Sequence, residues 1–216
     1  EQIAFLAHHD ALTGLPNRVL ARDRCEHAIV YAAREQGAVA LLFLDLDNFK
    51  TINDSLGHVA GDAVLQQVAR RLEQAVGGSD SVCRQSGDEF LIILDQAGDS
   101  DAVAATVSQL LAALVQPIHL NEMDVTVTCS LGIAQYPQDG ADFDTLLKHA
   151  DTAMYRAKDD GRNAFRFFDA QMNSSVAEHL QLISGMRVAL QQNQFVLYYQ
   201  PQFELASGRL VGVEAL

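Results

Sequence analysis

A continuous apolar run at Val39–Leu44 constrains the fold more than any other feature of this sequence. The run reads VALLFL and is followed at once by Asp45-Leu46-Asp47. Such a run is typical of a strand that is buried on both faces, as a central strand is. Side chains alternate along a strand, so Asp45 and Asp47 are expected on one face at its end.

The order of the other predicted elements indicates the class of fold. Helices are expected at Arg18–Gln36 with Asn17 as N-cap, at Ala63–Val76, at Ala102–Val115, and at Phe143–Lys158 with Gly161 ending it. Strands are expected at Val82–Gln85 and Phe90–Leu94, which form a hairpin, and at Val125–Gln135 and Ala164–Phe167. This order predicts an α+β, ferredoxin-like or palm-like sheet that contains antiparallel strands, with helices on one side.

Composition and charge limit the classes of partner. The chain has 216 residues, of which 49% are hydrophobic, so a sizeable core is available. The net charge of −13 argues against nucleic acid as a partner and against contact with an anionic membrane. Three widely spaced cysteines, Cys25, Cys83 and Cys129, are expected as core residues of a reducing, cytoplasmic compartment. If this chain handles phosphates, a metal ion or a local cluster of cations must do it.

The sequence changes in character after Asp169, which predicts two domains, 1–169 and 170–216. A helix at Asn173–Gln192 and strands at Phe195–Tyr199 and Leu210–Val213 are too few to make a domain alone. The chain begins without methionine or a signal-peptide pattern, so we expect a piece of a longer protein. That parent could be anchored in a membrane through segments that precede this sequence.

Two groups of acids could act together. Asp45 ends the predicted central strand, and Asp88 and Glu89 lie in the turn of the predicted hairpin. Either group alone is commonly structural, as a strand terminator or a turn. Two carboxylates brought close together repel each other unless a cation lies between them, and oxygen ligands suit Mg²⁺ shared with a nucleotide phosphate.

Two further groups have a structural and a functional interpretation. Lys158 and Arg162 could simply favour a helix C-terminus, or they could bind phosphates. Asn53 and Asp62, with His58 between them, could read a guanine edge. Alternatively, Asn53 belongs to a turn and Asp62 is the N-cap of a helix.

Together these motifs resemble the GGDEF family of diguanylate cyclases over residues from about 5 to 168. The resemblance is carried by DALTGLPNR at 10–18, LDLDNFK at 44–50, ND at 53–54, GHVAGD at 57–62, SGDEF at 86–90 and AKDDGRN at 157–163. The tail, with YQPQ at 199–202 and VEAL at 213–216, is similar to the start of an EAL domain, the cyclic di-GMP phosphodiesterase family. The parent is therefore expected to be a tandem GGDEF–EAL protein.

The resemblance implies a nucleotide-cyclase-type fold and a role for each matching residue. Asp45, the Leu46 carbonyl and Asp88 would hold Mg²⁺, with Mn²⁺ as the alternative, and Asp88 and Glu89 would be catalytic. Six side chains and one glycine would contact GTP, namely Asn53, His58, Asp62, Ser86, Gly87, Lys158 and Arg162. The family reaction joins two GTP into cyclic di-GMP and releases two pyrophosphates, which requires a homodimer because each subunit holds one GTP.

Two departures from the family pattern carry expectations. Ser86 replaces the first glycine of the signature and could crowd the nucleotide, so activity is expected to survive in weakened form because serine is small and both acids remain. Gly77 stands where the family's inhibitory Arg-x-x-Asp has its arginine, so weak product feedback is expected. The alternative function is a GTP-binding regulatory domain that makes no product and controls an adjoining EAL phosphodiesterase.

Overall fold

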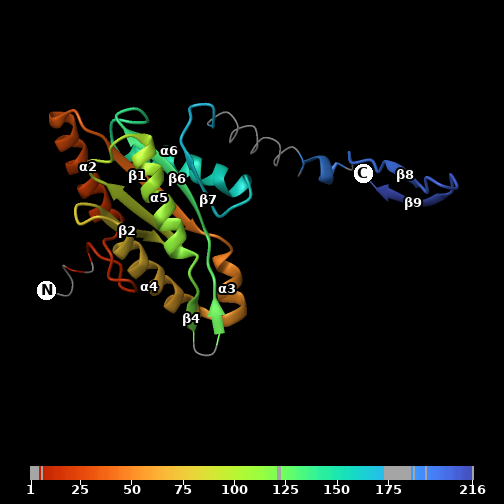
Figure 1. Ribbon diagram of the computed structural model, residues 1–216, viewed down its shortest axis with the longest axis horizontal. Helices are drawn as coiled ribbons and strands as arrows, with labels where there is room; N and C mark the ends of the chain where they lie inside the picture. Colours follow the sequence, from red (N-terminus) through yellow and green to blue (C-terminus); the bar gives the residue numbers. More distant parts are fainter. Residues whose placement is uncertain are drawn as a thin grey trace. The chain divides into compact units, whose positions relative to one another are not determined.

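A computed structural model of the chain describes residues 5, 7–120, 123–172, 186, 188–192 and 194–215. These residues fall into two compact units, Glu1–Met172 and Asn173–Leu216. Most of the helix expected at Asn173–Gln192 lies outside the described residues. We describe each unit by itself (Figure 1).

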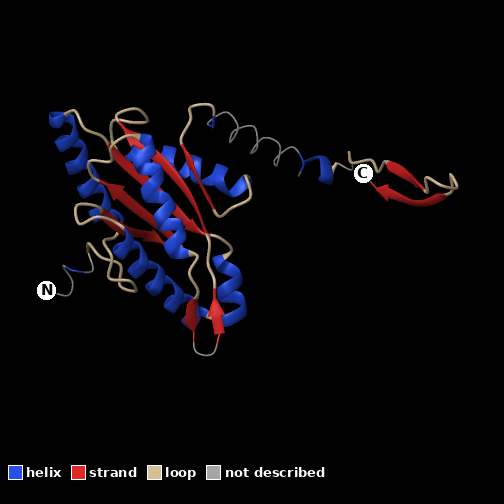
Figure 2. Cartoon of the chain, viewed as in Figure 1, coloured by secondary structure: helices blue, strands red, loops and turns tan. Residues whose placement is uncertain are grey.

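The first unit is built on a five-stranded sheet in the order β2-β3-β1-β6-β7 (Figure 2). The strands are β1 (Val39–Leu46), β2 (Ser81–Ser86), β3 (Glu89–Leu94), β6 (Cys129–Tyr136) and β7 (Ala164–Phe167). β1 lies in the middle and pairs antiparallel with β3 and β6, whereas β6 and β7 are parallel. The predicted central strand, the β2–β3 hairpin and the α+β class are confirmed.

Helices cover both faces of this sheet, so the expectation of helices on one side is wrong. α2 (Arg18–Glu35) and α6 (Phe143–Asp159) pack with Leu41 and Phe43 of β1. α4 (His58–Ala75) and α5 (Ser100–Leu114) pack with Leu42 and Leu44, on the opposite face. The side chains of β1 from Val39 to Leu44 are all apolar and alternate between the two faces of the sheet. Each face therefore needs an apolar cover, which the helices supply.

Two predicted boundaries are wrong for local reasons. The helix expected from Ala63 begins at His58, directly after α3 (Phe49–Leu56), because the left-handed Gly57 (φ +82°) separates the two helices. Asp62 therefore lies inside α4 and is not its N-cap, whereas Asn17 caps α2 as predicted. The strand expected at Val125–Gln135 is interrupted, since β4 (Ile118–Leu120) and β5 (Met123–Val125) form a separate hairpin ahead of β6.

The second unit contains a hairpin of β8 (Tyr199–Phe203) and β9 (Leu210–Ala215). The apolar run Phe195–Tyr199 is not a strand as predicted, because only Tyr199 belongs to β8. The apolar side chains of the hairpin are largely exposed within the described residues, with Phe203 at 58% and Val213 at 57%. Neither strand therefore buries an apolar face within this hairpin.

The three cysteines are buried and unpaired, which confirms them as core residues. Burial raises the pKa of the Cys25 and Cys83 thiols to about 12 and raises that of Cys129 as well. In the described part of the chain, no helix combines the length and the hydropathy that crossing a membrane requires.

Candidate functional site

The end of β1 and the tip of the β2–β3 hairpin lie side by side. Asp45 is the register partner of Glu89 across the β1–β3 pair. The amide of Leu46 donates to the backbone carbonyl of Asp88 at 3.2 Å, which extends the β1–β3 ladder to the residue before β3. Pairing between β1 and β3 therefore brings together Asp45, Asp88 and Glu89, which the sequence separates by a helical hairpin and a strand.

Lys158, near the end of α6, forms an ion pair with Asp45. Its ammonium Nζ lies 2.7 Å from Asp45 Oδ1, and the two side chains are only 27% and 14% exposed. Burial raises the pKa of the Asp45 carboxyl, Lys158 opposes the rise, and the charges of Asp88 and Glu89 add to it. The three acids and Lys158 thus form one electrostatic cluster. It combines the predicted metal-binding acids with one of the two predicted phosphate-binding cations.

Two charged side chains of the predicted metal and phosphate groups make no hydrogen bond or ion pair in this part of the structure. The Asp88 carboxylate and the exposed Arg162 guanidinium have no hydrogen bond or ion pair with any described residue. Arg162 is left-handed (φ +65°) directly after Gly161, at the turn that follows α6. These two charges are therefore available to a ligand.

The oxygen donors around Asp45 set the kind of metal that could bind. Among the described residues, no three His, Cys, Asp or Glu side chains converge as a metal site. The metal ligands would be the carboxylates of Asp45 and Asp88, a backbone carbonyl and oxygens of the bound ligand. This donor set suits Mg²⁺ better than zinc or copper. The residues present therefore fit a magnesium ion brought with a phosphate.

The hairpin tip explains how a serine fits at position 86. Gly87 has a left-handed backbone (φ +47°), whereas Ser86 does not. Only the second position of the signature therefore needs glycine for its conformation. The Ser86 hydroxyl donates to Glu89 Oε2 at 2.7 Å, so the extra atoms contact an acid of the site.

A brace behind the hairpin was missed by sequence reasoning, which found no role for Asp10 or Arg84. Arg84 Nη1 donates to Asp10 Oδ2 at 2.9 Å, and Arg84 Nε donates to the carbonyl of Gly87 at 3.0 Å. Asp10 also accepts from the backbone amide and the hydroxyl of Thr13, at 2.8 and 2.7 Å. The Asp10–Thr13 segment thereby holds the signature turn through one arginine. The presence of an arginine just before the signature was the only signal in the sequence.

We predict that Asp10→Asn destabilises the first unit by about 2 kcal/mol at pH 7, since it removes a charge-assisted pair. Burial would raise the pKa of Asp10, but the Thr13 hydrogen bonds and Arg84 outweigh it, and the pKa falls below its usual 3.8. A lowered pKa stabilises the fold above 3.8, and this contribution is lost as the pH falls through the folded-state value. Urea unfolding at pH 7 and pH 3 should show the difference from wild type shrinking in acid. The exposed Asp54→Asn is the control, and a difference that grows in acid would contradict the assignment.

The Asn53 side chain of α3 packs directly against Gly61 of α4. A Cβ atom at Gly61 would lie 1.9 Å from Asn53 Oδ1 and 3.3 Å from Phe49 Cζ. The missing side chain at position 61 therefore makes the space for the Asn53 amide. His58 and Asp62 are exposed on the first turns of α4 and hydrogen-bond to no described residue through their side chains. The structure thus keeps the group of Asn53, His58 and Asp62 on adjoining helices.

Asp47, which the sequence places on the same face as Asp45, serves the fold. It is 6% exposed and accepts hydrogen bonds from the Thr128 and Ser130 hydroxyls, both at 2.7 Å. A third comes from the Asn163 amide at 3.0 Å. Asp47 therefore ties the end of β1 to β6 and to the segment after α6, and both of its carboxylate oxygens are engaged in these bonds.

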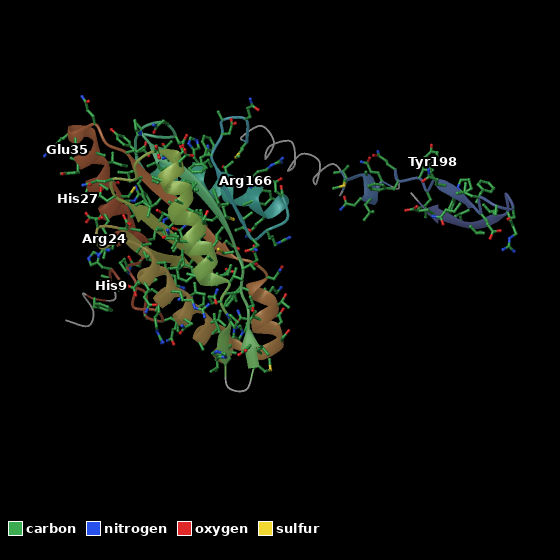
Figure 3. All side chains as sticks on the ribbon, viewed as in Figure 1. His9, Arg24, His27, Glu35, Arg166 and Tyr198 are labelled. Atoms are coloured by element: carbon green, nitrogen blue, oxygen red, sulfur yellow. The ribbon has the colours of Figure 1, made fainter. Side chains whose placement is uncertain are left out.

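The loop that precedes the hairpin is held by its own aspartate. Asp80 accepts from the backbone amides of Gly77 and Asp95, each at 3.0 Å. Arg24 and His27, which are labelled on α2 in Figure 3, line a neighbouring cavity of about 550 Å³ together with the acids Asp23 and Asp95. Gly77 itself has no side chain that could bind the product, and weak product feedback stays a prediction.

Comparison with known proteins identifies the first unit. Residues 7–164 match the family described as "Diguanylate cyclase, GGDEF domain". The bifunctional diguanylate cyclase/cyclic di-GMP phosphodiesterase MucR of Pseudomonas aeruginosa is 44% identical over all of this chain, and the cyclic di-GMP phosphodiesterase PdeR of Escherichia coli is 39% identical. The chain spans about a third of those relatives, 31% and 32% of their lengths.

A solved structure agrees with this match. The GGDEF domain of TpbB (YfiN) from Pseudomonas aeruginosa is 36% identical and superposes with a TM-score of 0.77, covering 79% of this chain and 99% of its own. The match extends over most of the chain in sequence and in fold. The chain belongs to the GGDEF family of diguanylate cyclase domains.

Proposed function

We propose that the first unit is a diguanylate cyclase, which condenses two GTP into cyclic di-GMP and two pyrophosphates. The observation that carries this proposal is the cluster of Asp45, Asp88, Glu89 and Lys158 at one end of the sheet. Acids that hold a divalent ion, next to cations that hold phosphates, are the machinery of phosphoryl transfer. Asp45 and Glu89 lie on strands that pair directly, Asp88 lies in the turn before Glu89, and Lys158 reaches Asp45 from α6.

Each predicted residue has a role in this proposal except Ser86, whose hydroxyl contacts Glu89. Asp45, Asp88 and the Leu46 carbonyl would hold Mg²⁺ or Mn²⁺, which would polarise the phosphates when bound. Lys158 and Arg162 bind the phosphates, and Gly87 lets the hairpin backbone approach them. Asn53, His58 and Asp62 contact the guanosine. Glu89 lies next to the reacting atoms and takes a proton from the attacking hydroxyl.

A homodimer follows from the number of sites. One subunit has one cluster of this kind among its described residues, and the product contains two guanylyl units. Two subunits must therefore face each other, so that each nucleotide supplies a hydroxyl to the other. Incubation with GTP and Mg²⁺, followed by chromatography, tests the proposal: cyclic di-GMP should form at a rate per subunit that rises with protein concentration. No product at high protein concentration would reject it.

The ion pair between Lys158 and Asp45 predicts that metal and nucleotide bind cooperatively. Without ligand the two groups neutralise each other, and a bound phosphate would draw Lys158 away and free the carboxylate. Lys158→Met is therefore expected to bind Mn²⁺ about tenfold more tightly without nucleotide, yet to bind GTP at least tenfold more weakly. Titration calorimetry measures both constants.

Lys148→Met, on the same helix, is the control and should leave the affinity for Mn²⁺ alone unchanged. Weaker Mn²⁺ binding by Lys158→Met in the absence of GTP would show that this lysine does not compete with the metal.

Gly61→Ala should impair recognition of the guanosine without unfolding the domain. The new methyl group would lie where the Asn53 amide oxygen now is, and that side chain must rotate away. We expect GTP affinity to fall about tenfold, the effect of losing one good hydrogen bond to a ligand. Calorimetry with GTP gives the constant, and circular dichroism checks the fold. Gly78→Ala, with open space at its Cβ, is the control, and equal affinities would remove Asn53 from the site.

The second candidate is a GTP-binding regulatory domain without turnover. Two observations favour it: Ser86 in the signature, and the phosphodiesterase name of the relative PdeR. Both candidates require GTP binding, so only the turnover assay separates them. The complete set of acids and cations, and the unstrained Ser86, favour the cyclase.

We further infer that residues 170–216 link this domain to the start of an EAL phosphodiesterase domain. Gln200 in β8 and Glu214 in β9 are register partners, so the two residues that resemble EAL positions lie across from each other. The exposed apolar side chains of the hairpin are those expected where further strands would pack.

A further inference from the structure

We propose that a cavity beside Glu89 binds the ribose diol of the second GTP, whose 3′-hydroxyl attacks. The cavity measures about 360 Å³ and lies between α2, the β2–β3 hairpin and α6. Its walls include Phe43, Gln85, Glu89, Leu147 and Asp151. This inference rests on the proposed cyclase function. It gives roles to Gln85 and Asp151, which the family resemblance does not.

The polar walls of the cavity offer acceptors that have no donor. Gln85 Oε1 is buried and accepts no hydrogen bond. The Asp151 carboxylate accepts none from any described residue, and Glu89 uses only Oε2, for Ser86. Of these acceptors Gln85 Oε1 is the buried one, whereas Asp151 is exposed and Glu89 is half-buried. A buried acceptor is normally satisfied, so the cavity favours a ligand that donates.

Arg18, Asp144 and Lys148 also line the cavity, so its charge is mixed and does not by itself select the ligand. A fully ionised phosphate has no proton to donate to Gln85 Oε1, whereas the vicinal hydroxyls of ribose are donors that an amide oxygen or a carboxylate binds well.

The apolar walls suit the same ligand. Phe43 and Leu147 are nearly buried, at 4% and 8% exposed, and come from β1 and α6. They provide a surface for the carbon face of a sugar ring, and the volume lies within the range of small-molecule sites. The cavity therefore combines an apolar wall with acceptors, as a sugar subsite requires.

The electrostatics of Asp151 are consistent with a neutral donor. Partial burial raises the pKa of its carboxyl, the charge of Glu89 adds to the rise, and Lys158 opposes it. A hydroxyl donated to either carboxylate would offset this repulsion without adding negative charge.

The cavity continues from the site of the first GTP. Phe43 precedes Asp45 by two residues on the same face of β1, and Glu89 is the register partner of Asp45. Glu89 therefore borders both the cavity and the Asp45–Lys158 pair. A ribose here would place its 3′-hydroxyl by Glu89. The bond from O3′ to the α-phosphorus of the first GTP forms, the bond from that phosphorus to pyrophosphate breaks, pyrophosphate leaves, and the hydroxyl proton passes to the Glu89 carboxylate.

The test separates the two nucleotides. Asp151→Asn and Gln85→Leu should each lower kcat for cyclic di-GMP by about 10–100-fold. Both should bind 3′-deoxy-GTP, which occupies a site but cannot attack, within about twofold of wild type in calorimetry. Wild type should also use GTP faster than 2′-deoxy-GTP, and Asp151→Asn should lose this preference, a change that misfolding would not produce.

Asp159→Asn, an exposed carboxylate on α6 outside the cavity, is the control and should match wild type throughout. The subsite is rejected if Asp151→Asn keeps the wild-type kcat and the preference for GTP, or if 3′-deoxy-GTP binding falls along with kcat. An inactive wild-type chain would reject the cyclase function itself, and the subsite with it.

Discussion

Asp88→Ala is expected to lower the rate of cyclic di-GMP synthesis by about 10³-fold or more while leaving the domain folded. The Asp88 carboxylate makes no hydrogen bond or ion pair with a described residue, so its removal costs the fold little. In the proposed site it is one of only two carboxylates that hold the metal ion, and such an ion stabilises the transition state by several kcal/mol. About 4 kcal/mol corresponds to a 10³-fold loss.

Chromatographic measurement of product with saturating GTP and Mg²⁺ gives the rate, and thermal unfolding gives the stability. Asp101→Ala, an exposed acid in the first turn of α5, is the control and should keep the wild-type rate. An undiminished rate in Asp88→Ala would remove the proposed metal from the reaction.

Gly132→Ala is expected to destabilise the first unit by about 3 kcal/mol or more, the largest effect on stability of any substitution proposed. A Cβ atom at this position in β6 would lie 1.9 Å from the carbonyl oxygen of Ala150 and 2.2 Å from the amide nitrogen of Met154. Both atoms belong to the backbone of α6, which cannot rotate aside as a side chain does. The helix would have to move off the sheet, and overpacking of this kind is costly.

The expected fall in melting temperature is about 6–12 °C, which circular dichroism or calorimetry can measure. Cyclase activity should fall too, because α6 carries Lys158 to Asp45. Gly78→Ala is the matched control, since nothing lies within 4 Å of its added methyl group. A melting temperature within 2 °C of wild type would mean that α6 does not pack on Gly132 this closely.

The positions of the acids in the sheet could be predicted because they depend on short-range patterns. An unbroken apolar run followed by Asp45 specifies a buried strand and its end, and a short polar turn between two apolar runs specifies a hairpin with Asp88 and Glu89 at its tip. The same local rules identified Asn17 as the cap of α2. They failed where a single left-handed glycine, Gly57, decides where a helix begins.

What the sequence by itself determined is the set of elements, their apolar faces and the motifs at their ends, since each depends on neighbours a few residues apart. Tertiary structure alone decided that helices cover both faces of the sheet, that Asp47 serves the fold while Asp45 pairs with Lys158, and that Arg84 joins Asp10 to the signature turn. It also decided that Gln85 and Asp151 share a cavity. These contacts join residues far apart in the sequence, and strand pairing and the packing of helices on the sheet select them, which no local pattern encodes.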